Sequence, residues 1–291
     1  MGRTSAQVGV FGVPGESWDA IIAALHAVGA TWLEVRAAPD ALVHTGLTAA
    51  ERSAVRARLA ASGITTLAIA SGVRLGAPVP TDVVVADLSA HLHLAVDLGA
   101  PFVRVFPGAA TQPGPTDHVP DLVRDRAGVN AEMGERLGMA SLLAADLGVG
   151  ILVETHDSHL RGSDIVRLLD AIPGGVPASV GVIWDLLHPW RVGESPADTW
   201  RMLGPWLREG RGYVQIKDVT HPRDLTPVLP GTGQVPLREA LRILRRGGYS
   251  GPVSLEWERT WYPDVPTLGE ALRAVAEADL LNELLDPETP R

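Results

Sequence analysis

Short apolar runs rich in β-branched residues alternate with amphipathic segments along the whole chain. The apolar runs predict eight strands, at 7–13, 31–37, 64–70, 101–107, 149–155, 179–185, 212–218 and 252–258. The segments between them have helical spacing, at 17–30, 48–63, 81–100, 128–147, 163–172, 195–207, 236–248 and 267–285. The second of these begins with Thr48 and has Glu51 three residues later, which predicts a capping box, and it stops at Gly63.

A regular alternation of strand and helix predicts parallel strands that are joined by crossover helices. Eight such units fit an α/β fold of the (β/α)₈ type, a TIM barrel, and we expect it to occupy residues 1–291 as a single domain. An open, doubly wound sheet would usually carry a G-x-G-x-x-G turn after its first strand. The segment GVFGVPGES at 9–17 lacks that spacing, so the barrel is favoured.

Composition narrows the function classes. The net charge of −9 argues against a protein that binds a nucleic-acid backbone. The absence of cysteine excludes disulfides, thiolate nucleophiles and Cys-ligated zinc. The chain shows neither a signal peptide nor an apolar run of membrane-spanning length, so we expect a cytoplasmic protein that does not bind membranes. The sequence leaves open whether it forms a homo-oligomer.

Polar residues stand at or near the carboxyl ends of the last four predicted strands, where barrel enzymes place their active sites. These residues are Glu154, Asp185, Gln215 and Glu256. Three carboxylates packed together repel one another strongly, and a divalent cation removes that repulsion. An all-oxygen set favours one Mg²⁺ or Mn²⁺ ion over Zn²⁺.

Gln215 raises a separate question, because a buried amide is costly unless a partner satisfies it. The alternation of GYVQIKD places Gln215 on one strand face with Tyr213 and Lys217. We expect its amide oxygen to bind the metal ion. The simpler interpretation is that Gln215 only forms a hydrogen bond to a barrel neighbour.

Five motifs in order resemble the sugar phosphate isomerase/epimerase family, whose fold is the xylose-isomerase-like TIM barrel. The motifs are VETHDS, IWDLLHPWRVGE, VQIKD, GTGQVPL and SLEWERTWYPD, and the resemblance is strongest from Gly148 to Asp264. In that family a Glu, an Asp, a His and a Glu hold one divalent metal ion. The matching positions here are Glu154, Asp185, Gln215 and Glu256, with Gln in place of the usual His, as in the hydroxypyruvate isomerase branch.

The resemblance implies an isomerase or epimerase that acts on a sugar or small hydroxy-carbonyl compound through an enediolate. Glu154 and Glu256 would be the catalytic residues that transfer the proton. The substrate-binding residues would be His188, Arg104, His156, Lys217 and Trp261. Trp257 is a further candidate to close the pocket, although a barrel Trp is at least as often a packing residue.

Three alternatives use the same fold. A metal-dependent lyase or dehydratase would eliminate a leaving group from the same enediolate. A nuclease of the endonuclease IV type would need several zinc ions, many His ligands and a basic groove, which the net charge and the scattered His residues disfavour. A non-catalytic sugar-binding protein would lack both bound metal and proton exchange.

Overall fold

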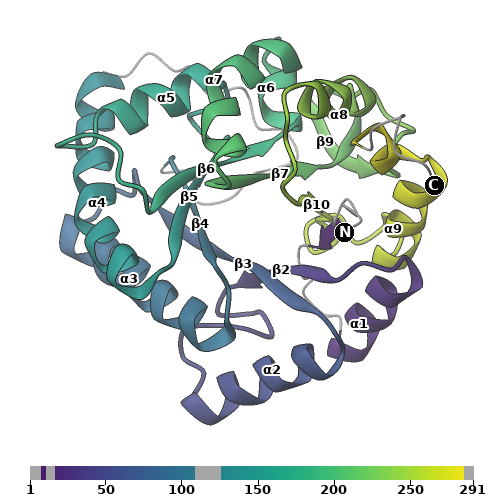
Figure 1. The fold of residues 1–291 in the computed structure, drawn as a ribbon, viewed down its shortest axis with the longest axis horizontal. Helices are drawn as coiled ribbons and strands as arrows, with labels where there is room; N and C mark the ends of the chain where they lie inside the picture. Colours follow the sequence, from purple (N-terminus) through teal and green to yellow (C-terminus); the bar gives the residue numbers. More distant parts are fainter. Residues whose placement is uncertain (1–7, 11–16, 109–125, 285–291) are drawn as a thin grey trace.

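The computed structural model describes residues 8–10, 17–108 and 126–284, and within them it has one nearly closed barrel of parallel strands surrounded by helices (Figure 1). The barrel order is β1-β10-β7-β6-β5-β4-β3-β2. The strands are β1 (Val8–Val10), β2 (Trp32–Ala37), β3 (Thr65–Arg74), β4 (Phe102–Phe106), β5 (Gly150–Glu154), β6 (Val180–Asp185), β7 (Gly212–Ile216) and β10 (Val253–Leu255). Strands are present at all eight predicted positions, although residues 7 and 11–13 of the first predicted strand lie outside the described residues, and the TIM barrel prediction is confirmed.

Helices follow the strands and form the outer layer (Figure 1). They are α1 (Trp18–Ala27), α2 (Ala49–Ala61), α3 (Thr81–Leu98), α4 (Arg126–Leu147), α5 (Gly162–Asp170), α6 (Leu187–Arg191), α7 (Pro196–Arg208), α8 (Leu237–Arg246), α9 (Leu268–Glu277) and a 3₁₀ turn, η1 (Leu280–Leu284). The capping box predicted at Thr48 and Glu51 is present at the start of α2. None of the described helices is long and apolar enough to cross a membrane.

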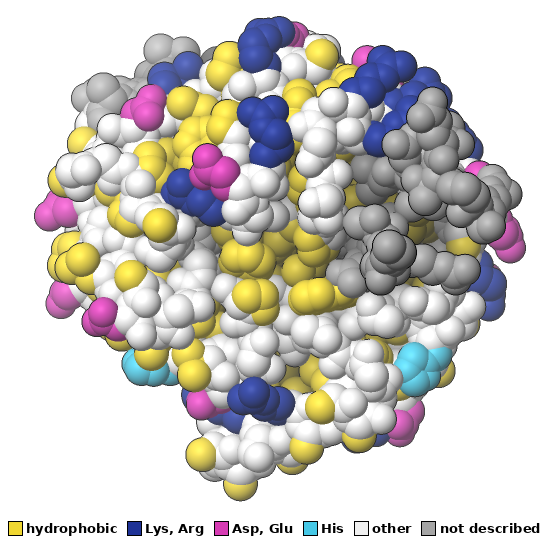
Figure 2. Space-filling view, in the orientation of Figure 1, with side chains coloured by type: hydrophobic (Ala, Val, Ile, Leu, Met, Phe, Trp, Pro, Cys, Tyr) yellow, Lys and Arg dark blue, Asp and Glu magenta, His cyan; other side chains and the backbone are white. Residues whose placement is uncertain are grey.

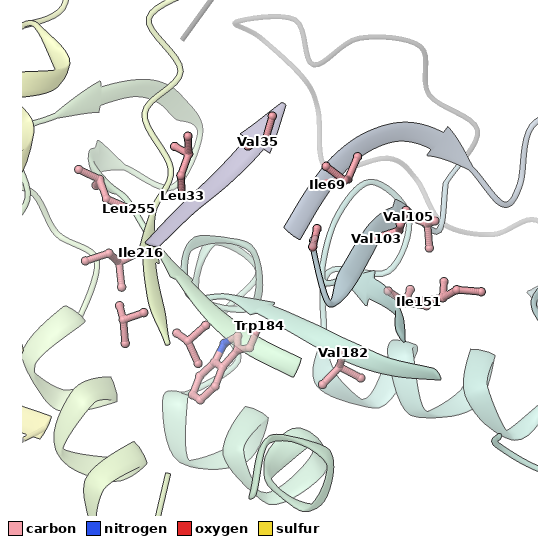
Figure 3. Packing of buried hydrophobic residues seen from close by; sticks show 14 of the residues in the cluster. Leu33, Val35, Ile69, Val103, Val105, Ile151, Val182, Trp184, Ile216 and Leu255 are labelled. Atoms are coloured by element: carbon pink, nitrogen blue, oxygen red, sulfur yellow. The ribbon is translucent and has the colours of Figure 1, made fainter. Parts of the chain in front are cut away.

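Alternation along the strands separates two cores. Apolar side chains on the outer faces of the strands pack against the helices, and Figure 3 shows Val182 and Trp184 of β6 and Ile216 of β7 among them. A smaller interior cluster is formed by Leu67, Ala68, Leu152, Ile183 and Tyr213. It fills one part of the barrel interior, so the polar side chains further along the same strand faces are held above an apolar floor.

A register shift in the pairing of β2 with β3 lies between Leu33 and Glu34. Leu33 pairs with Thr66, but Glu34 pairs with Ala68, so β3 has one extra residue at this point. Such irregularities change the direction of neighbouring side chains. Glu34 is fully buried inside the barrel. It was not predicted as a site residue, because it does not stand at the carboxyl end of a predicted strand.

The antiparallel hairpin of β8 (Asp218–His221) and β9 (Asp224–Val228) was not predicted; it directly follows β7 and Lys217. Asp218 anchors the hairpin to the next loop, because its carboxylate accepts hydrogen bonds from the backbone N–H groups of Gly231, Gly233 and Val235 at 2.9–3.1 Å. The two strands of the hairpin are short and rich in polar residues, so their sequence resembles that of a loop.

Seen down the short axis of the molecule, apolar side chains gather over the middle of the face and most charged ones lie toward its edge (Figure 2).

Candidate active site

Three predicted metal ligands come together inside the barrel. Glu154 ends β5, Asp185 ends β6 and Glu256 follows β10 directly, and each is at most 3 % exposed. One carboxylate oxygen from each of the three lies within 4.8 Å of the other two. We call these three residues the carboxylate cluster.

Two buried cations partly neutralise the carboxylate cluster. Arg104 of β4 places Nη1 3.1 Å from Glu154 Oε2 and 3.9 Å from Glu256 Oε1. Lys217, just after β7, places Nζ 2.5 Å from Glu256 Oε2 and 3.0 Å from Asp185 Oδ2. Both residues were predicted to bind substrate, and in the structure both contact the acids directly.

Two histidines line the same site. His188 Nε2 lies 3.3 Å from Asp185 Oδ2, and both ring nitrogens of His188 are buried without a hydrogen-bond partner among the described residues. The ring of His156 lies 4.5 Å from that of His188, centroid to centroid, and its Nδ1 is 2.8 Å from Asp157 Oδ1. His188 therefore has free hydrogen-bonding capacity, while Asp157 fixes the orientation of His156.

Gln215 has a partner that the sequence did not indicate. Its Nε2 donates to Glu34 at 2.9 Å (Oε1) and 3.2 Å (Oε2), while its own Oε1 is buried with no hydrogen-bond partner in the described structure. Glu34 also accepts hydrogen bonds from the hydroxyls of Tyr213, at 2.5 Å, and Ser254, at 2.7 Å. The one signal in the sequence was a lone acid between Leu33 and Val35, two apolar residues of the strand.

The two tryptophans have different surroundings. Trp257 is fully buried, and its indole N–H donates to Pro266 O at 2.9 Å, so it is a packing residue, not a pocket-closing one. Trp261 is partly exposed, and the guanidinium of Arg36 lies 5.6 Å from its ring centroid. No contact links Trp261 to the carboxylate cluster within the described ranges.

Burial and charge shift the ionisation of the cluster. Burial raises the pKa of Glu154 well above its usual range, despite the attraction of Arg104. Burial likewise raises the pKa of Asp185 to about 7, with Lys217 opposing the shift. Burial acts in the same direction on Glu256, but Lys217 and Arg104 outweigh it and lower its pKa. Repulsion from Glu256 adds a smaller contribution to the raised pKa of Glu154 and of Asp185.

The residues present fit a divalent ion. Among the described residues, the acids Glu34, Glu154, Asp185, Glu256 and Glu258 surround two cations, Arg104 and Lys217, which would leave a net charge of −3 if all seven groups were ionised. Glu154 Oε1 and Gln215 Oε1 are buried oxygens without a hydrogen bond from any described residue. Ligands on opposite sides of a Mg²⁺ ion lie about 4.2 Å apart, which is compatible with the spacing of the carboxylate cluster.

The family model for the xylose isomerase-like TIM barrel matches residues 22–283. A search of curated proteins finds no match to the sequence. Solved structures with the same fold include a D-psicose 3-epimerase determined in the presence of D-fructose, with 17 % identity, a TM-score of 0.73 and coverage of 94 % of this chain and 99 % of that one.

Two further structures are similar. The IolI protein, which was solved with a zinc atom, has 15 % identity, a TM-score of 0.71 and coverage of 95 % of this chain and 99 % of its own. The probable 3-DHS dehydratase AsbF from Bacillus anthracis has 16 % identity, a TM-score of 0.69 and coverage of 93 % and 98 %. At these identities the likeness establishes the fold, whereas the family model covers most of the sequence itself. The chain belongs to the xylose isomerase-like TIM barrel family.

Proposed function

We propose that the protein is a divalent-metal-dependent isomerase or epimerase of a sugar or a small hydroxy-carbonyl compound. The observation that carries the proposal is the carboxylate cluster, in which three buried acids share one small space inside the barrel. Three carboxyl groups packed together with unsatisfied oxygens are a costly arrangement for a purely structural core. A cation site with a proton-transfer function accounts for both features.

The residues that would hold the ion are Glu154, Asp185, Gln215 and Glu256. All four offer oxygen, which favours Mg²⁺ or Mn²⁺ over Zn²⁺. A bound ion supplies a Lewis acid that polarises the substrate carbonyl and makes the neighbouring C–H more acidic.

Glu154 and Glu256 would move the proton. They belong to β5 and β10, which are separated by β6 and β7 in the sheet, so they reach the barrel interior from different sides. One carboxylate removes a proton from carbon and the other returns one. Return to the opposite face of the same carbon gives epimerisation, and return to the neighbouring carbon gives aldose–ketose isomerisation.

The remaining polar side chains would bind substrate. His188 has both ring nitrogens available for substrate hydroxyls. Arg104 and Lys217 would hold a polyhydroxy or anionic end, while His156 and Trp261 contribute to the walls. Burial of His188 lowers its pKa well below the usual range, so it would act as a neutral hydrogen-bonding group.

The test is proton exchange at carbon. The protein is loaded with Mn²⁺ or Mg²⁺ and incubated in D₂O with a panel of ketoses, aldoses and hydroxypyruvate, and deuterium next to the carbonyl is detected by NMR. We expect at least one compound to acquire deuterium and to yield an epimer or isomer. A product that has lost water would instead identify a dehydratase, and absence of both metal uptake and exchange would overturn the proposal.

Replacing Gln215 by His should change the metal preference. The imidazole offers nitrogen where the amide offers oxygen, so the Gln215→His variant is expected to bind Zn²⁺ or Co²⁺ about 10-fold more tightly relative to Mg²⁺ than the parent does. Isothermal titration of each ion into metal-free protein measures the ratio. An unchanged ratio would mean that residue 215 does not touch the ion.

Metal binding should also depend on pH. Ligand carboxylates must lose their protons, and burial raises the pKa of Asp185 to about 7. Below that pH we expect the affinity for Mn²⁺ to fall by up to about 10-fold per pH unit for each proton released. Titration in weakly buffered solution with a pH indicator measures the released protons. No proton release between pH 6 and 7 would contradict the placement of Asp185 in the metal site.

A further inference from the structure

Glu34 is a buried acid whose two oxygens are both used by hydrogen bonds. Oε1 accepts from the Tyr213 hydroxyl at 2.5 Å and from Gln215 Nε2 at 2.9 Å. Oε2 accepts from the Ser254 hydroxyl at 2.7 Å and from the same Gln215 nitrogen at 3.2 Å. Its three partners come from β7 and β10, so this single residue links β2 to the strands that surround the carboxylate cluster.

A carboxylate decides which way an amide faces. The two ends of a Gln side chain are nearly identical in shape, and only hydrogen-bond partners distinguish them. An ionised Glu34 accepts and cannot donate, so it holds the NH₂ group of Gln215 and directs the carbonyl oxygen away. That oxygen is buried and accepts no hydrogen bond from the described residues.

The backbone register places this amide beside the carboxylate cluster. Gln215 pairs with Asp185 across β7 and β6, and with Ser254 across β7 and β10. Glu34 reaches it over 181 residues of sequence, from a strand at the other end of the sheet order. Glu34 therefore holds the NH₂ group of the Gln215 amide, and the residue that carries the free carbonyl oxygen is the strand neighbour of Asp185.

We propose that Glu34 is a positioning residue that fixes the carbonyl oxygen of Gln215 as a metal ligand. The inference rests on the proposed function, since it gives one ligand of that metal site its orientation. A hydrogen bond from the amide N–H groups to a carboxylate also polarises the amide and makes its oxygen a better donor, as acids behind metal-bound histidines do. A neutral Gln can thus replace an imidazole in this position.

The test is a double-mutant cycle read by Mn²⁺ affinity. Isothermal titration is carried out on the parent, Glu34→Gln, Gln215→Ala and the double variant. We expect Glu34→Gln to weaken Mn²⁺ binding 10- to 100-fold in the parent and by less than about 2-fold in the Gln215→Ala background. The effect should disappear because Glu34 acts through an amide that is no longer there.

Two further variants separate orientation from charge. Glu34→Asp keeps the charge but shortens the side chain, and it should still weaken binding in a manner that depends on Gln215. Glu258 lies 3.7 Å from Lys217 and has no hydrogen bond or ion pair with Gln215 in the described structure, so Glu258→Gln is the matched loss of charge. Its effect should be equal in both backgrounds. Circular dichroism and urea unfolding verify that each variant is folded.

The outcomes are distinct. Glu34 effects of equal size with and without Gln215, or no effect of Glu34→Gln and Glu34→Asp, would overturn the positioning role while leaving the metal site intact. A parent protein that takes up no divalent ion would overturn the proposed function, and the role of Glu34 with it.

Discussion

Replacement of either Glu154 or Glu256 by Gln is expected to reduce carbon–hydrogen exchange with solvent deuterium by a factor of about 10² to 10⁴, the range that general acid–base groups contribute. Each Gln keeps the shape of the side chain but cannot accept the proton. Both residues are buried within the carboxylate cluster, so no bulk water takes over their role. The exchange rate is followed by NMR with the substrate identified in the panel.

The measurement requires saturating metal, because loss of a ligand charge also weakens binding of the ion. Glu239→Gln, on the exposed side of α8, is the matched control and should leave exchange unchanged. Persistent exchange in both active-site variants would place the base elsewhere, with His156 and His188 as the next candidates.

Gly181→Ala is expected to destabilise the protein by more than about 4 kcal/mol, or to prevent folding. A Cβ at position 181 of β6 would lie 1.9 Å from the carbonyl oxygen of Arg211, which is backbone and cannot move aside like a side chain. That oxygen accepts the hydrogen bond of Val182 N at 3.0 Å. Relief of the clash would separate β6 from β7, the strands that carry Asp185 and Gln215.

Urea unfolding of the metal-free protein measures the effect. Gly269→Ala in α9 is the matched control, because a Cβ there meets no atom within 4 Å, and Ala is favoured over Gly inside a helix by about 0.5–1 kcal/mol. We expect the control to be slightly more stable than the parent. A Gly181→Ala protein of normal stability would contradict the close approach of the two strands.

The sequence was informative where the pattern is local. Apolar runs located the eight barrel strands, a capping box located the start of α2, and the rule that barrel sites lie at strand ends located Glu154, Asp185 and Glu256. Apolar runs and strand ends can both be recognised within a short segment of sequence. A segment's own periodicity determines which of its faces is buried, so alternation was sufficient to align these acids.

The partners of buried polar groups were not predictable in the same way. Glu34 and Gln215 meet through the barrel interior, and no periodicity within β2 or β7 specifies that contact. The shift between Leu33 and Glu34 depends on pairing with β3, which is also a long-range property. The β8–β9 hairpin was missed because its strands are short and polar, and such segments resemble loops.

Lys217 has a consequence for the order in which the protein would acquire the proposed metal ion. Its ammonium group lies between Asp185 and Glu256, at 3.0 and 2.5 Å, and so compensates part of their charge within the folded barrel. Many small metal-binding domains cannot fold before their ion arrives. This barrel carries its own counter-ion, so we expect it to fold first and to be metallated afterwards. The ion it then holds in the cell would be set by supply and competition after folding, and not by which ion was present when the chain left the ribosome.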